Sequence, residues 1–130
     1  CSNALRVALS LQSDPRVSWV NYPGLSDHPQ HALLQRQMRG ASGLLAFGVK
    51  GGIGPGVKFI EAAQMMSHLV NIGDARTLIS HPASTTHRQL DAAQQMAAGV
   101  LPDMIRISVG LEHIDDILWD IDQALAAAHR

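Results

Sequence analysis

The sequence has few cysteines and few aromatic residues, and each shortage excludes a class of protein. Cys1 is the only cysteine among 130 residues, so no disulfide can form within the chain, which fits a reducing compartment. Aromatic residues make up 4% of the chain, too few for the stacking platform of a single-strand nucleic-acid binder. The net charge of -1 gives no basic surface for nucleic acid or an anionic membrane. We therefore expect neither as a partner.

Long apolar runs are also missing. No stretch approaches the about 20 apolar residues that a membrane-spanning helix needs, and no signal-peptide pattern opens the chain, so we expect a cytoplasmic protein. The chain does not begin with methionine, and we expect it to be part of a longer protein. Its 46% hydrophobic and 16% charged residues are typical of one globular domain, which at this size buries roughly two-thirds of its unfolded surface.

Hydrophobic periodicity predicts helices that alternate with strands. Pro15 ends the first helix, the Pro23-Gly24 turn ends the first strand, and Asp91 is a candidate cap for the fourth helix. The predicted helices cover 2–12, 29–39, 59–70, 92–98 and a last segment that starts with Glu112, Asp115 and Asp116, and the predicted strands cover 17–22, 44–49, 77–80 and 103–112. We predict an α/β (α+β) fold, a two-layer sandwich in which a mostly antiparallel sheet of about four strands carries helices on one face.

A glycine cluster, G-V-K-G-G-I-G-P-G-V-K at 48–58, lies between a strand and a helix. Backbone amides at such a helix start can bind phosphate. The spacing, however, matches neither the P-loop nor the dinucleotide fingerprint, and Pro55 lacks an amide donor. The cluster favours a tight strand-to-helix connection that needs glycine dihedral angles, with phosphate binding as the alternative.

Seven histidines raise the question of a metal site. His81 and His87 flank P-A-S-T-T with no cysteine or carboxylate at ligand spacing, and His28 and His31 are separated by a proline that prevents a helical pair. We expect no metal. The pattern favours histidines in loops, on the surface or hydrogen-bonded at a cleft.

Hydroxyl groups are dense in the same stretch, H-P-A-S-T-T-H at 81–87. Ser84 or Thr86 can act as a helix cap or form a Ser/Thr turn. No G-x-S-x-G pattern surrounds any serine, so a serine nucleophile is not expected.

Arg106 lies in the middle of the apolar strand D-M-I-R-I-S-V-G-L-E at 103–112. An unpaired buried charge is very costly, so this guanidinium must be paired, hydrated or functional. One alternative is a bidentate pair of hydrogen bonds from the guanidinium to the carboxylate of a ligand. The other is an internal salt bridge to Asp74 or Asp103. The residue pattern leaves both open.

Several motifs together resemble the C-terminal end of the Cys/Met-metabolism enzymes that depend on pyridoxal phosphate. They are V-N-Y-P-G-L at 20–25, F-G-V-K-G-G at 47–52, N-I-G-D-A-R-T-L-I-S-H-P-A-S-T-T-H at 71–87, A-A-G-V at 97–100 and I-R-I-S-V-G-L-E-H-I-D-D-I at 105–117. The resemblance covers nearly the whole chain. The asparagine at 71 and the S-T-T-H ending make it most similar to the O-acetylhomoserine sulfhydrylase branch.

The resemblance implies the small C-terminal domain of a fold-type-I enzyme over 15–130, preceded by the end of an inter-domain helix at 1–14. It implies that Arg106 grips the α-carboxylate of an amino-acid substrate. Asn71 aligns with a second carboxylate contact, and Thr86 would line the substrate cleft. The intact enzyme would use pyridoxal phosphate, act in homocysteine or methionine biosynthesis and form a homo-oligomer, in this family usually a tetramer.

The sequence departs from the family in lacking its cofactor lysine. The only lysines are Lys50 and Lys58, and neither matches the family's lysine motif, which lies upstream in a large domain. We expect this chain to hold no cofactor, to be inactive alone and to need that missing cofactor-binding domain as a partner. The alternative is a stand-alone amino-acid-binding or protein-interaction module derived from the family.

Overall fold

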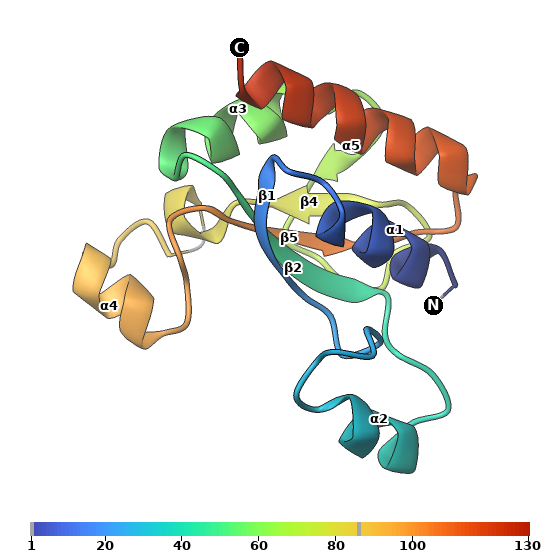
Figure 1. Ribbon diagram of the computed structural model, residues 1–130. Helices are drawn as coiled ribbons and strands as arrows, with labels where there is room; N and C mark the ends of the chain where they lie inside the picture. Colours follow the sequence, from blue (N-terminus) through green and yellow to red (C-terminus); the bar gives the residue numbers. More distant parts are fainter. Residues whose placement is uncertain (1, 86) are drawn as a thin grey trace.

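The computed structural model describes residues 2–85 and 87–130, which form a five-stranded sheet packed against helices (Figure 1). The strands are β1 Val17–Asn21, β2 Leu44–Val49, β3 Ser67–His68, β4 Leu78–Ser80 and β5 Met104–Ser108. Their order is β1-β2-β5-β4-β3. Every neighbouring pair is antiparallel except β3 with β4. A mostly antiparallel sheet was predicted, but the parallel pair was not, and the sheet has five strands where about four were expected.

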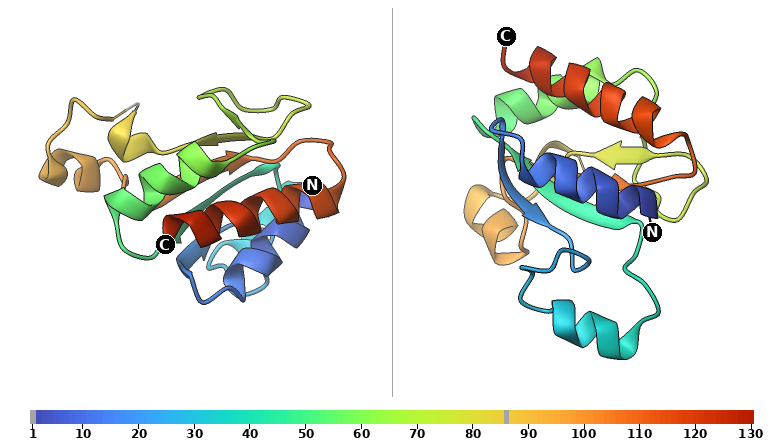
Figure 2. Two further views of the ribbon diagram at one scale, coloured as in Figure 1. Left: turned by 90° about the horizontal axis from the view of Figure 1, so that it is seen from above. Right: turned by 45° about the vertical axis from the view of Figure 1, so that its right-hand side comes forward.

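The helices divide into a packed layer and two outlying pieces. They are α1 Ser2–Gln12, α2 His31–Gln37, α3 Ile53–Ala62, α4 Ala92–Ala97 and α5 Ile114–Ala128, with a short 3₁₀ turn η1 at Pro82–Ser84. Figure 2 shows α1, α3 and α5 side by side on one face of the sheet, whereas α2 and α4 lie away from this layer. No described helix is long and apolar enough to span a membrane.

The core fills the space between these three helices and the sheet. Phe47 of β2 meets Phe59 of α3 edge to face, with ring centroids 5.6 Å apart, and both are fully buried. Because side chains alternate along a strand, only every second residue of β2 and β5 enters this core. The α1 helix contributes four buried residues to the same cluster, Ala4, Val7, Ala8 and Leu11. The assignment of 1–14 to an inter-domain helix stays a prediction.

The predicted helix over 59–70 lies at 53–62 instead, so its sequence position was wrong. Gly51 and Gly52 have φ angles of 104° and 85°, which only glycine adopts readily, and they turn the chain directly from β2 into α3. The expected tight connection is thereby confirmed.

The end of α3 and the start of α5 depend on side chains from distant parts of the chain. Asp120 of α5 accepts hydrogen bonds from three successive backbone N–H groups, at residues 64–66, each at 2.8 Å, so the helix cannot continue there. Glu112, which was predicted in the first turn of α5, lies outside it and accepts from Thr77 N and Oγ1 at 2.6 and 2.8 Å. At α4 the predicted cap is confirmed, because Asp91 accepts from Gln94 N.

Candidate functional site

Arg106 lies in the middle of β5, on the sheet face opposite the helices. Its neighbours Ile105 and Ile107 are fully buried in the core, so the alternation of strand side chains points Arg106 to the other side. Ala46 of β2 and Ser80 of β4 lie directly opposite it. The small Ala46 side chain leaves space beside the guanidinium, which is only partly buried.

Within the described residues, Arg106 donates from Nη2 to the backbone oxygen of Val70 and forms no ion pair. Asp74 pairs instead with the neighbouring Arg76 at 3.6 Å. Asp103 accepts hydrogen bonds from two side chains of β1. The internal salt bridge is therefore excluded for residues 2–85 and 87–130, and the charge remains available to a ligand.

Asn71 and Arg106 line one hollow of about 450 Å³. Asn71 belongs to an exposed loop between β3 and β4, and Gly73 ties this loop to β5 by donating its N–H to Ser108 Oγ at 3.1 Å. Gly73 has a φ of 79°, a conformation that favours glycine. Asp74 lines the same hollow, and a hydrogen bond from the backbone N–H of Arg76 lowers the pKa of the Asp74 carboxyl.

A second hollow, of about 470 Å³, lies on the other side of Arg106. Asn21, at the end of β1, and His28, in the following loop, line it together with Arg106. Their side chains are hydrogen-bonded, with His28 Nε2 2.8 Å from Asn21 Oδ1. The sequence analysis assigned no role to either residue, although Asn21 lies in the family-like motif V-N-Y-P-G-L.

The third predicted site residue, Thr86, lies outside the described residues. Before it in the chain, Thr85 Oγ1 donates to His81 O at 2.7 Å and Ser84 Oγ lies 3.3 Å from the same oxygen, so Ser84 bonds back to the preceding turn and does not cap a helix. His81 is fully buried, with Nε2 2.7 Å from Pro102 O and Nδ1 2.7 Å from Ser84 Oγ. A carbonyl oxygen only accepts, so Nε2 carries the proton and Nδ1 accepts from the serine. His81 is thus a structural core histidine, not a surface one.

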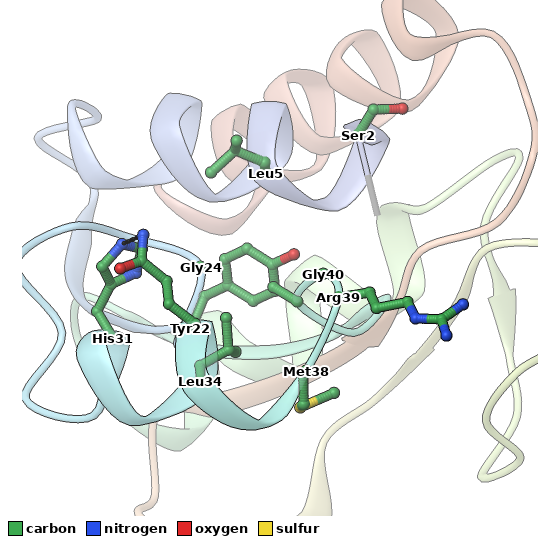
Figure 3. Close-up of a pocket in the computed structure, with 11 residues that line it drawn as sticks. Ser2, Leu5, Tyr22, Gly24, His31, Leu34, Met38, Arg39 and Gly40 are labelled. Carbon is green, nitrogen blue, oxygen red and sulfur yellow. Dashed lines mark hydrogen bonds between the residues drawn. The ribbon is translucent and has the colours of Figure 1, made fainter.

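A further pocket lies apart from this site, between α1 and α2 (Figure 3). It measures about 380 Å³ and is lined by Leu5, Tyr22, Leu34 and Met38 among others. Tyr22 Oη donates to a backbone oxygen 2.8 Å away, and burial raises the pKa of this phenol. Arg39 also lines this pocket, and Figure 3 shows its side chain extending away from the Tyr22 ring.

Among the described residues, the two hollows beside Arg106 contain neither a cluster of metal ligands nor a lysine. Among residues 2–85 and 87–130, no three His, Cys, Asp or Glu side chains gather as metal ligands. Lys50 and Lys58 are exposed, and neither lines a hollow that contains Arg106.

Comparison with known proteins places these residues within a known enzyme family. The sequence model of the Cys/Met metabolism PLP-dependent enzymes matches residues 1–126. The chain belongs to this family. It is 50% identical over 125 residues to O-acetyl-L-homoserine sulfhydrylase 1 of Thermus thermophilus, covering 95% of this chain and 30% of that protein. It is 44% identical over 128 residues to L-methionine gamma-lyase of Pseudomonas putida, covering 98% of this chain and 32% of that protein.

The family depends on pyridoxal phosphate, but the described residues here do not fit that group. A pyridoxal enzyme holds its cofactor through a lysine Schiff base, and neither lysine of this chain lines a hollow beside Arg106. The chain also spans only about a third of the length of its curated relatives. Among the described residues, the two hollows therefore contain a guanidinium without a carboxylate partner, and no lysine.

Proposed function

We propose that this chain is the C-terminal, substrate-carboxylate-binding domain of a pyridoxal-phosphate-dependent transsulfuration enzyme of the O-acetylhomoserine sulfhydrylase type. The observation that carries the proposal is the guanidinium of Arg106, which has no carboxylate partner in the described part of the chain and lies between two hollows. Matches to sulfhydrylases and to a methionine gamma-lyase support amino-acid chemistry at carbon–sulfur bonds. The reaction belongs to homocysteine or methionine biosynthesis, and we place the enzyme in the cytoplasm.

In this proposal, Arg106 binds the substrate's α-carboxylate with its planar fork of N–H donors. A bidentate pair fixes orientation as well as position, and its strand is rigidly held between two others. Asn71 contributes a side-chain amide from the loop on one side of the guanidinium. Holding a substrate in one orientation is how such residues contribute to rate, so their role is positioning and the bond-breaking chemistry comes from the cofactor.

The cofactor would be bound by a large domain that packs against the open face of the sheet. The loop beside Arg106 carries exposed apolar side chains, with Val70 and Ile72 exposed to 51% and 59%. Exposed apolar patches commonly mark an interface. We propose that the complete enzyme is a homo-oligomer, a tetramer as in the family, and that the domain described here is inactive without the cofactor-binding part.

Kinetics of Arg106→Ala and Arg106→Lys in the complete enzyme test this proposal. Truncating one partner of a hydrogen-bonded charge pair costs several kcal/mol, so Arg106→Ala should lower kcat/KM for O-acetyl-L-homoserine by about 10²- to 10³-fold. Lysine keeps the charge without the fork and should recover part of the loss. Arg36→Ala, at an exposed arginine of α2, is the matched control. Unchanged kinetics in Arg106→Ala would refute the assignment.

A stand-alone amino-acid-binding module is the second candidate. It is favoured by the fact that Arg106 and Asn71 both come from this chain and already share a hollow. Calorimetry with the 130-residue chain and L-methionine, L-cysteine or O-acetyl-L-homoserine separates the two functions. Millimolar or tighter binding supports the module, and absence of binding supports a domain that needs the rest of the enzyme.

A further inference from the structure

The open face of the sheet places a second polar group in line with Arg106. Asn21 of β1 lies opposite Ala46 of β2, and Ala46 lies opposite Arg106 of β5, so the three share one face. Neighbouring strands are 4.7–4.9 Å apart, which puts the Cα atoms of Asn21 and Arg106 about 10 Å from each other. Only the methyl group of Ala46 stands between them, and the hollow they both line runs over it.

Hydrogen bonds fix the orientation of the Asn21 amide. The backbone N–H of Gln30 donates to His28 Nδ1 at 3.0 Å, so in the neutral ring the proton is on Nε2. That proton is donated to Asn21 Oδ1 at 2.8 Å. The oxygen of Asn21 is thus occupied, and its Nδ2 has no acceptor among residues 2–85 and 87–130. An amide donor therefore remains available in the hollow that contains Arg106.

We infer that Asn21 recognises the acyl group of the substrate, by donating a hydrogen bond from Nδ2 to the acyl carbonyl oxygen while Arg106 binds the α-carboxylate. This inference rests on the proposed function. An O-acyl amino acid carries its two strong acceptors at opposite ends, and the two donors on the sheet are separated in the same way. The thioether of methionine is only a weak acceptor and would gain little from Asn21. His28 acts through Asn21 and is a positioning residue.

The test compares two ligands in the complete enzyme. O-acetyl-L-homoserine has both acceptors, whereas L-norleucine, which is to be assayed as an inhibitor and has a side chain of similar length, has only the carboxylate. Asn21→Asp keeps an acceptor for His28 and removes the Nδ2 donor. It should lower kcat/KM for O-acetyl-L-homoserine by about tenfold or more and leave the inhibition constant of L-norleucine within twofold. Gln37→Glu makes the same change from amide to carboxylate at an exposed residue of α2 and is the matched control. It should alter neither kcat/KM for O-acetyl-L-homoserine nor the inhibition constant of L-norleucine.

Variants of His28 test its positioning role. His28→Leu removes the donor that orients the amide and should reduce the preference for the acylated substrate, whereas His28→Gln supplies an N–H and should restore it. Asn21→Ala checks that the aspartate variant does not act through its charge.

The outcomes distinguish the inference from the proposed function. Equal losses for both ligands, or no loss in Asn21→Asp and Asn21→Ala, overturn the role of Asn21. If Arg106→Lys weakens both ligands in the same experiments, the carboxylate site stands regardless. If Arg106→Lys weakens neither, the proposed function fails and the inference fails with it.

Discussion

Replacing Asp120 by asparagine should destabilise the fold far more than an isosteric change usually does. Asp120 is fully buried, and its two oxygens accept four hydrogen bonds. Oδ1 accepts from Gln64 N and Gln123 Nε2, and Oδ2 accepts from Met65 N and Met66 N. An asparagine turns one of these acceptors into a donor, so two N–H groups then face an NH₂ group.

The magnitude follows from the count of bonds lost. Hydrogen bonds to a charged group contribute about 1.5–3 kcal/mol each, so losing two costs about 3–6 kcal/mol. That is a large fraction of the 5–15 kcal/mol of a typical domain and should lower the urea midpoint by roughly 2 M. The fluorescence of Trp19 and Trp119 reports unfolding, and hydrogen exchange at Met65 and Met66 reports the local loss.

Asp116→Asn is the matched control, because Asp116 is an exposed carboxylate in the first turn of the same helix. It should cost at most about 1 kcal/mol. If Asp120→Asn were no more destabilising than this control, the carboxylate could not be what holds residues 64–66 to α5.

Two further predictions concern stability. The pKa of Asp14 is lowered, chiefly by a hydrogen bond from the Arg16 side chain. This carboxylate therefore stabilises the fold above its unfolded pKa, and the stabilisation is lost as the pH falls through the folded pKa. Asp14→Asn should lower the free energy of unfolding by about 1 kcal/mol at pH 7 and change it little at pH 2, as measured by urea titration. A Cβ at Gly48 would clash with Trp19 Nε1 and Asp103 Oδ2, so Gly48→Ala should cost about 1–3 kcal/mol, measurable as a lower Tm, whereas Gly54→Ala, which has open space, should not.

Local patterns predicted the elements whose ends depend on nearby residues. The first helix and the capped fourth helix are of this kind, whereas the strand around Arg106 ends at Ser108 and not at residue 112 as predicted. The third helix was misplaced because its end depends on Asp120, more than fifty residues later in the chain. Its apolar periodicity continues past Ala62, but the backbone N–H groups that follow bond to α5 rather than to their own helix, and β3 forms in the remaining segment.

Only part of the candidate site could be predicted from the sequence, because some of its residues meet through pairing between distant strands. Alternation and family resemblance pointed to Arg106, and resemblance pointed to Asn71, which the structure places in the same hollow. Asn21 and His28 went unassigned because their approach to Arg106 depends on the register of β1 with β2 and of β2 with β5. Strand register between separate segments cannot be read from one sequence without knowing which strands pair.

Alternation along β5 also ties the site to the stability of the fold. A slip of this strand by one residue would turn Arg106 into the core beside Phe47 and expose Ile105 and Ile107. An unpaired buried charge and two lost core side chains would each cost several kcal/mol, so the slipped arrangement cannot compete. The same pattern that buries the isoleucines therefore keeps the guanidinium on the open face, between the amides of Asn21 and Asn71.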